Sequence, residues 1–502
     1  MIRHSTLLLG VLLALALVWA PLPFGSVTPW ADSLLRIVSG CALALAAASL
    51  PAAVRLRRAL LPAALLVSVG LFGVVQALPL PAGVVGLVAP EHAALQRGAA
   101  DLLRAESPLP ARLSLSPQAS LSAAVGWLAL AGAFLAAAVA GHGRRERRLC
   151  LTAIVATGLF EVFFGARDWF SRSLTLWGVD LHASATRLRG TFVNPNHAAL
   201  YLEIALAVVF AWGWWALRRA MATSQLERRV FLLAPAAIVW LLLFAGLAFT
   251  GSRAGLLAAI VAVSIQGLLM VRLRRRWWLA PLGAVVALLG LLVVAALGRQ
   301  EGLGRLLQTT ADDSSFDSRL REYRAVVDLW GHFPLTGSGL GTFRDAFPLV
   351  QGGGLPNTYW HPHSTLLEVP ATTGLVGVAL LTAALWLVVR RLLFGLKWGA
   401  RSEDRASALA ALGALISVGV HEAFDFGLTM PGTAFTFAVL VGSALTVKTE
   451  VKPRRGSEKG RRARQDLSAV GAGKLEHVQP APHGDRDAER RAERDRGDGE
   501  GP

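Results

Sequence analysis

Long apolar segments separated by short polar connections occupy the first 447 residues of the chain. A helix that crosses a bilayer needs about 20 mostly apolar residues. Segments near this length lie at 5–21, 31–50, 60–78, 119–140, 149–166, 197–217, 230–250, 254–271, 277–298, 365–389, 406–421 and 428–447. The pattern therefore predicts an all-α polytopic membrane protein with about twelve transmembrane helices. Three longer polar connections stand between these helices, at 79–118, 167–196 and 299–364.

The pattern changes after residue 447, where closely mixed charges replace the apolar residues. A segment of this kind has too little apolar surface to fold. We therefore predict four parts. They are N-terminal transmembrane helices with a polar loop at 79–118 (1–186), a core that includes the loop 299–364 (187–390), the last transmembrane helices (391–447) and a disordered cytoplasmic tail (448–502).

Composition excludes a soluble enzyme, because only 17% of the residues are charged and soluble domains average about 25%. The net charge of +17 does not indicate nucleic-acid binding, since most of the arginine clusters stand in short gaps between apolar segments. The positive-inside rule explains them better. With the N-terminus inside, the rule assigns these clusters to the cytoplasm and the three long polar connections to the outside. Membrane lipids are therefore expected partners, and nucleic acid is not.

Four polar segments on the predicted outer side carry residues capable of chemistry. The first, 187–197, contains Asn194-Pro195-Asn196, which is typical of a turn that caps the following helix. Capping does not require the two arginines of this segment, Arg187 and Arg189, or His197, so a role in binding stays open.

The second segment, 250–255, is a very short connection with Arg253 between two spans, on the side that is usually poor in arginine. The third, 318–341, begins as a predicted helix. Arg319 and Tyr323 share one face of this helix, whereas Arg321 lies on another.

The fourth segment, 360–377, contains His361 and His363. Two histidines two residues apart supply at most half of a metal site. We therefore predict no bound metal.

Taken in order, the four segments resemble the O-antigen ligase and O-antigen polymerase superfamily of bacterial membrane glycosyltransferases. The most specific element is His363-Ser364, followed after nine residues by Gly374-x-x-Gly377. The other matching elements are the Ser252-Arg253 turn, the Arg319-x-x-x-Tyr323 helix and Pro334-Leu-x-Gly-x-Gly-Leu-Gly341. The family often has Trp where this chain has Tyr323. The resemblance covers about 187–390.

The resemblance implies a helical membrane glycosyltransferase of the GT-C type, inverting and independent of metals and cofactors. Such an enzyme moves a glycan from an undecaprenyl-pyrophosphate carrier to a hydroxyl group of a glycan, of lipid A-core or of a protein. It acts at the periplasmic face of the bacterial inner membrane.

The departing diphosphate is negatively charged, and guanidinium groups can bind it bidentately. Arg253 and Arg319 are the catalytic candidates for this role, with Arg189 and Arg321 as further substrate contacts. The acceptor hydroxyl needs a proton acceptor, and a histidine can serve. We expect His363 to be this base or to contact the diphosphate instead. The remaining expected substrate contacts are Asn196 and His361.

One sequence does not separate a glycan ligase from a polymerase or a protein O-glycosyltransferase, although the pattern at His363 favours a ligase. The alternative from another class is a transporter or flippase of lipid-linked glycans. Transporters place ionisable residues near the middle of their spans. Here Glu203, Glu368, His421 and Asp425 lie near predicted outer ends, and only Glu161 lies deeper. The pattern therefore favours the enzyme.

Overall fold

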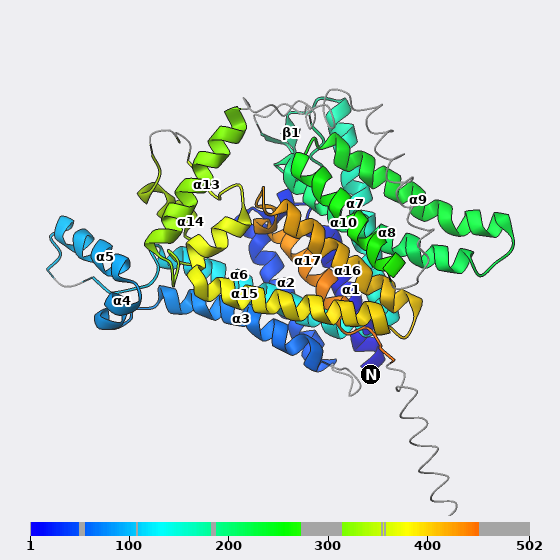
Figure 1. Cartoon of the computed structure of the whole chain (residues 1–502), viewed down its shortest axis with the longest axis horizontal. Coiled ribbons are helices and arrows are strands. Elements are labelled where there is room, and N and C mark those ends of the chain that lie inside the picture. Colours follow the sequence, from blue (N-terminus) through cyan, green and yellow to red (C-terminus); the bar gives the residue numbers. More distant parts are fainter. Residues whose placement is uncertain are drawn as a thin grey trace, which may run out of the picture. The chain divides into compact units, whose positions relative to one another are not determined.

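The structure is a computed structural model that describes residues 2–49, 56–106, 109–181, 187–272, 314–352, 355 and 358–450. Almost all regular structure in these residues is helical (Figure 1). The sheet found in this part of the chain is a small antiparallel hairpin formed by β1 (Thr175–Leu176) and β2 (Val179–Asp180). The predicted span 277–298 and the tail beyond residue 450 lie outside the described residues.

Within the described ranges, eight helices are long and apolar enough to cross a membrane. They are α2 (Pro29–Ala48), α3 (Arg57–Ala77), α6 (Pro117–Gly141), α7 (Arg144–Phe170), α8 (Pro195–Ala220), α9 (Leu226–Phe249), α10 (Arg253–Arg272) and α15 (Thr365–Trp398). Three further helices coincide with predicted spans: α1 (Ile2–Trp19), α16 (Ser402–His421) and α17 (Pro431–Leu445). The prediction of an all-α polytopic membrane protein is therefore confirmed, whereas the count of twelve stays a prediction.

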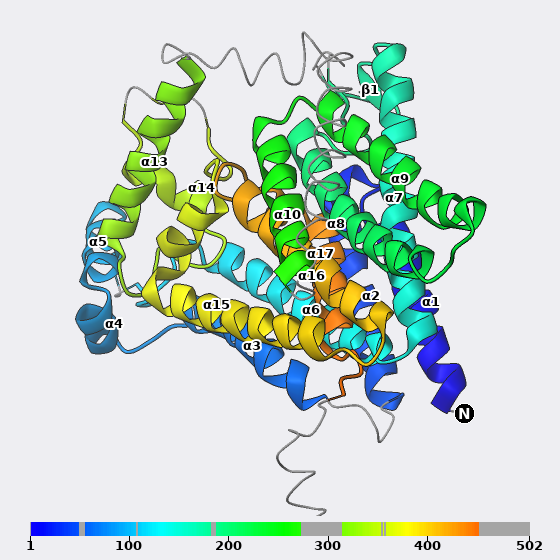
Figure 2. The ribbon, with the colours of Figure 1, turned by 45° about the vertical axis from the view of Figure 1, so that its right-hand side comes forward.

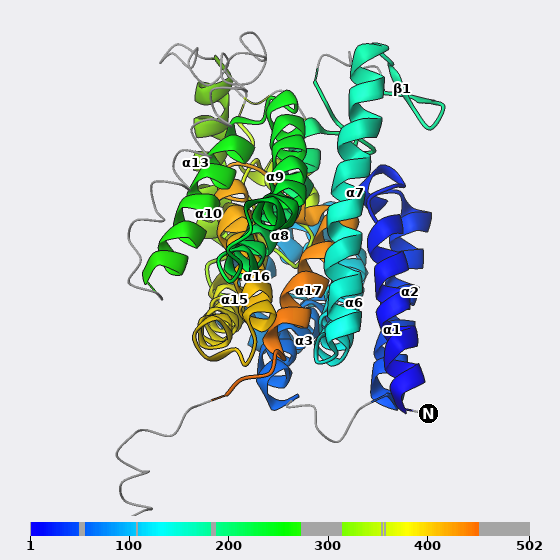
Figure 3. The same ribbon diagram turned by 90° about the vertical axis from the view of Figure 1, so that its right-hand side faces the viewer.

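The helices pack as a bundle in which α8 is central. Figure 3 shows α1 and α2 beside α6 and α7, and α8 contacts α9, α10 and α16. Small residues let these helices approach closely, as is usual in membranes. On α6 and α17, for example, a side chain at Gly141 or Gly442 would collide with the backbone of the facing helix. Proline begins α2, α6, α8 and α17, where its missing N–H has no helical partner to lose.

Several of the arginine clusters that the prediction assigns to the cytoplasm meet at one end of this bundle. Arg147 at the start of α7 forms a buried ion pair of 2.6 Å with Asp404 at the start of α16. Arg144 and Arg148, which are more exposed, both pair with Glu403 in the same turn of α16. These contacts join the basic start of α7 to acids at the start of α16, at the end of the bundle that the predicted topology assigns to the cytoplasm.

At the opposite ends of α3 and α15, a polar layer lies beyond the spans (Figures 1 and 2). Its helices are α4 (Ala82–Val88), α5 (Pro90–Leu102), α13 (Ser314–His332) and α14 (Phe343–Ala346), with the 3-10 turn η3 (Phe347–Leu349). A separate apolar cluster that includes Leu329, Phe333, Phe343 and Phe347 holds α13, α14 and η3 together. Helix α13 agrees with the helix expected in the first part of the segment 318–341.

Helix α15 is broken at Gly374, and this break connects the polar layer to the bundle. Gly374 has φ +60°, which a residue with a side chain rarely adopts. The loop 334–339 lies in the break: Pro334 O accepts from Leu375 N, and Ala371 O accepts from Ser338 N. A side chain at Gly337 or Gly374 would collide with the opposite backbone. The two glycine motifs of the sequence therefore fit against each other and fix the first turns of α15.

Candidate functional site

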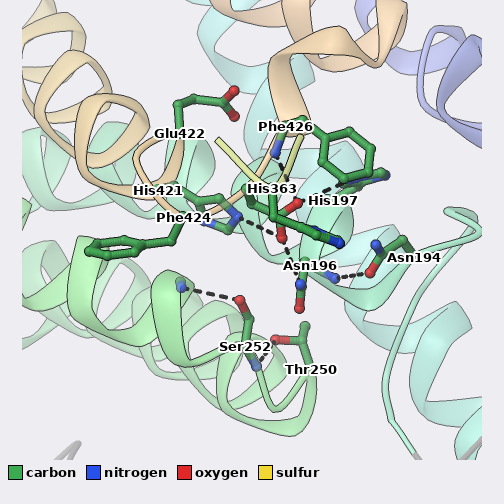
Figure 4. A network of polar contacts seen from close by, with 12 residues as sticks. Asn194, Asn196, His197, Thr250, Ser252, His363, His421, Glu422, Phe424 and Phe426 are labelled. Atoms are coloured by element: carbon green, nitrogen blue, oxygen red, sulfur yellow. Dashed lines mark hydrogen bonds and ion pairs between the residues drawn. The ribbon is translucent and has the colours of Figure 1, made fainter. Parts of the chain in front are cut away.

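Polar side chains gather at the end of the bundle that faces the polar layer (Figure 4). They come from the start of α8, the approach to α15 and the connection 422–427 between α16 and α17. The Phe426 ring lies at the centre of this group. Its centroid is 5.0 Å from that of His197, 5.2 Å from His361 and 5.5 Å from His363. Three histidines from two separate segments thus surround one aromatic ring.

Asp425 connects the start of α8 to this group. Its carboxylate accepts a hydrogen bond of 2.6 Å from Asn196 Nδ2 and lies 3.9 Å from Nε2 of both His197 and His421. Asn194 caps α8 by accepting from Asn196 N, as the sequence predicts. Asn196 therefore belongs to this group of polar side chains around Phe426, which we call the cluster, through both its backbone and its side chain.

The turn before Arg253 is held against the same residues. Arg187 donates to Asn196 Oδ1 at 2.8 Å and to the Thr250 carbonyl at 2.6 Å. Two residues after Arg253, a Cβ atom at Gly255 would lie 2.8 Å from Glu203 Oε1. Arg253 is half-buried at the first position of α10, so it stands at the edge of the cluster.

The fully buried pair Glu203 and His421 packs against the cluster on its bundle side. His421 Nδ1 lies 2.7 Å from Glu203 Oε1, and Ser417 donates to Glu203 Oε2 at 2.7 Å. Glu203 and His421 have no exposed side-chain surface. A buried carboxylate without such partners would be costly, so this pair fixes α16 against α8 and aims His421 Nε2 toward Asp425.

The backbone of His363 is fixed from α13. Glu322 Oε1 accepts from His363 N at 3.1 Å, and the Tyr323 hydroxyl donates to His363 O at 2.6 Å. The His363 ring is buried at Nδ1, and this atom has no hydrogen-bond partner among the described residues. Burial lowers the pKa of His363, and the positive charge of Arg319 lowers it further. The His363 ring is therefore held toward its neutral form.

Arg319 lies on the face of α13 that points at the connection 422–427. Its Nη1 donates a long hydrogen bond of 3.5 Å to Phe424 O. Helical spacing places Arg319 and Tyr323 together, as predicted, and both reach the segments that carry the histidines. His363 and Arg319 are thus adjacent in the structure although 43 other residues separate them in the sequence.

The charged groups around His361 and His363 shift the pKa values of the two rings in opposite directions. His361 Nδ1 lies 2.9 Å from Glu368 Oε1. Burial alone would lower the pKa of His361, but the Glu368 carboxylate outweighs it and the pKa is raised. Burial raises the pKa of Glu322 and of Glu422 to about 7. The two neighbouring histidines therefore differ, since His361 is held toward its charged form and His363 toward its neutral form.

Two predicted contact residues lie elsewhere. Arg189 is buried and donates at 3.3 Å to Ser173 O and at 3.4 Å to Thr175 O, next to the hairpin. Arg187, two residues earlier, reaches the cluster in its place. Arg321 is exposed on another face of α13. The structure thus brings Asn196, Arg253, Arg319, His361 and His363 to one region, and it does not bring Arg189 or Arg321 into contact with that group.

Sequence reasoning assigned no role in the site to Asp425, Phe426 and His421. The signal that could have pointed to these residues is the connection 422–427, which follows His421 and contains two acids but no lysine or arginine. Glu161, the acid predicted to lie deepest, accepts from Thr191 N at 2.7 Å and from Thr191 Oγ1 at 2.8 Å. It therefore holds the segment before α8 in place, a structural role that needs no transport pathway.

Other features of the described residues lie away from this region. No group of three His, Cys, Asp or Glu side chains in these residues is placed to hold a metal ion. A cavity of about 370 Å³ lies among α7, α8, α9 and α16, lined by residues such as Trp212 and Trp215, with Arg148 and Glu403 among its lining residues. It is therefore at the basic end of the bundle, not at the candidate site.

Residues 237–382 match the family described as O-antigen ligase. This segment contains Arg253, Arg319, Arg321, His361 and His363, so the resemblance found in the sequence is confirmed. Arg189, Asn196 and the connection 422–427 lie outside it. A search of curated proteins found no match.

Proposed function

We propose, on the premise that residues 237–382 of this chain are an O-antigen ligase domain, that the protein is an inverting membrane glycosyltransferase. It transfers a glycan from an undecaprenyl-pyrophosphate carrier to a hydroxyl group of lipid A-core, of another glycan or of a protein. The site faces the periplasm, at the surface of the bacterial inner membrane. The family supports the ligase type of reaction, and the arginine clusters at the opposite end of the bundle support the sidedness.

The observation that carries the mechanism is the pairing of His363 with Arg319. A general base must be unprotonated at the working pH, and its nitrogen must not be held in another hydrogen bond when the acceptor arrives. His363 has a lowered pKa and a buried Nδ1 without a hydrogen-bond partner among the described residues. The arginine that contributes to the lowered pKa is also a donor for phosphate oxygens. One neighbouring pair thus supplies both of the functions that the reaction needs.

In the proposed reaction, the acceptor hydroxyl oxygen attacks the anomeric carbon of the donor sugar from the side opposite to the diphosphate. The bond between that carbon and the diphosphate oxygen breaks as the new glycosidic bond forms, so the anomeric configuration inverts. The imidazole of His363 accepts the hydroxyl proton. Arg319 and Arg253 neutralise the negative charge on the leaving diphosphate, which needs no metal ion.

The residues around His363 and Arg319 hold the reacting groups in position. Glu322 and Tyr323 hold the His363 backbone at both its N–H and its carbonyl. Phe426 forms an apolar wall beside the ring. Asp425 orients Asn196, which we propose as a contact to the glycan or the diphosphate. His361, held toward its charged form by Glu368, supplies a further cation.

The test is transfer in vitro by the full-length protein in nanodiscs, with lipid-linked glycan extracted from the cells that make it. The expected result is a product of inverted anomeric configuration by NMR, formed at the same rate with and without EDTA. The His363→Ala variant serves as the matched negative control. Retention of configuration, or loss of transfer with EDTA, would contradict the mechanism. Absence of transfer with every acceptor class would refute the function.

A further inference from the structure

Trp360 is a large aromatic side chain exposed beside the candidate site. It has 61% of its surface exposed, although its neighbour Tyr359 packs inward against Phe347 with ring centroids 5.4 Å apart. The Arg344 guanidinium lies 3.6 Å from the centre of the Trp360 ring. One face of the indole is therefore covered by a cation, and the exposure of the side chain leaves the other face open.

The contact between Arg344 and Trp360 differs from the other arginine–tryptophan contacts in the described residues. The pairs Trp214–Arg218, Trp215–Arg219 and Trp386–Arg390 are each four residues apart on one apolar helix, so helical geometry alone brings them together. Arg344 and Trp360 belong to two different segments of the polar layer, α14 and the loop before α15. Tertiary packing therefore holds this pair.

Both partners are anchored in the same aromatic cluster. Phe343 and Phe347, on either side of Arg344 in the sequence, stack with centroids 4.9 Å apart. Tyr359, which contacts Phe347, fixes the backbone next to Trp360. An exposed aromatic ring whose backbone and stacking partner are both held in this way is suited to binding a ligand, because little side-chain entropy remains to be lost on binding.

We propose that Trp360 is a stacking platform for a pyranose ring of the transferred or accepting glycan. The apolar C–H face of a sugar packs against the open face of the indole, and the edge of the Arg344 guanidinium donates to sugar hydroxyls. This assignment rests on the proposed function. Trp360 is three residues from His363, and three residues span at most about 11 Å, roughly the length of two linked sugar rings. This limit applies to the Cα atoms, and it places the platform near the sugars closest to the reacting carbon.

The test compares Trp360→Ala and Trp360→Phe with Trp386→Ala as a matched control. Trp386 is exposed to a similar extent, 58%, and also carries an arginine over its ring at 5.3 Å. It lies 12 residues beyond the break at Gly374, about 18 Å along the second part of α15. The KM for the lipid-linked donor and the KM for the acceptor are measured separately with each variant, together with kcat.

Trp360→Ala should raise one of the two KM values on the order of tenfold, which corresponds to about 1.4 kcal/mol, with kcat little changed. Trp360→Phe, which keeps an aromatic face, should recover most of the affinity. The KM that changes identifies the donor or the acceptor as the glycan bound. Unchanged KM values for both substrates, as in the Trp386→Ala control, would overturn the proposal and leave Trp360 as a residue of the membrane interface.

A second measurement separates this proposal from the proposed function. The glycan is released from the donor by mild acid, and its binding to the protein in nanodiscs is followed by saturation-transfer NMR. Wild-type protein should show contacts to sugar C–H groups that Trp360→Ala loses and Trp386→Ala keeps. If no transfer occurs but these contacts appear, the function fails and the platform stands. If the contacts are equal in all three proteins, the platform fails.

Discussion

Replacing Arg319 tests the proposed site most directly. Among the described residues, the Arg319 guanidinium donates one long hydrogen bond, to Phe424 O at 3.5 Å. An arginine has five N–H donors, so most of them remain available for phosphate oxygens. Removing one preorganised donor of this kind costs about 10²–10³ in rate, or about 2.7–4 kcal/mol. Arg319→Gln should therefore lower kcat by this factor. Arg319→Lys should recover only part of the loss, because a point charge does not reproduce the planar fork.

The pH dependence gives a second, independent result. A base must be neutral to accept a proton, so the rate falls as pH decreases through the pKa of His363. The positive charge of Arg319 disfavours protonated His363 and contributes to its lowered pKa. Arg319→Gln removes this charge, so the pKa should rise and the acidic limb of the rate profile should move to higher pH. Arg319→Lys keeps the charge and should move the limb less.

The assay is kcat/KM between about pH 5 and 9, the range that contains the titration of a histidine. Arg324→Gln is the control, since Arg324 is an exposed arginine five residues further along the same helix. Near-normal transfer by Arg319→Gln would refute the role of Arg319. A large loss of rate with an unmoved acidic limb would refute the assignment of His363 as the base that Arg319 influences.

Three further predictions concern the base, the buried ion pair and the topology. His363→Ala should lower the rate by about 10²–10⁴ while a labelled donor still binds, and loss of donor binding would assign His363 to the diphosphate instead. Arg147→Met should lower the free energy of unfolding by about 3–5 kcal/mol, because it leaves the buried Asp404 carboxylate without its ion-pair partner. Denaturant unfolding in detergent measures this change. The double variant Arg147→Met/Asp404→Leu should regain part of the lost stability. An unchanged unfolding midpoint in the single variant would contradict the prediction. After removal of the native cysteines, an impermeant maleimide should label a cysteine at Asp317 in intact cells but not one at Ser457, and the reverse pattern would overturn the topology.

The membrane class and most helices could be predicted from the sequence because each depends on local properties. A span needs only a continuous apolar segment, and a helix start needs only a capping residue, as at Asn194 before α8. Once the first part of 318–341 is expected to be a helix, the i, i+4 spacing puts Arg319 and Tyr323 on one face. The family resemblance also rests on local motifs, and it led to His363, Arg253 and Arg319.

The partners of those residues depended on the tertiary structure, because they come from segments far apart in the chain. Asp425 contacts Asn196 from 229 residues away, and the sequence contains no periodicity that links the two. Arg187 and Arg189 are equivalent as sequence, yet packing turns one toward Asn196 and buries the other beside the hairpin.

The two glycine motifs show the same difference between sequence and structure. The sequence contains Gly337 and Gly374 as separate features, and only the folded chain fits one into the break of the other. A sequence determines which residues favour a helix, a cap or the membrane. Which segments meet at the end of the bundle is decided by packing between helices, since contacts such as Asp425 with Asn196 and Tyr323 with His363 join parts far apart in the chain.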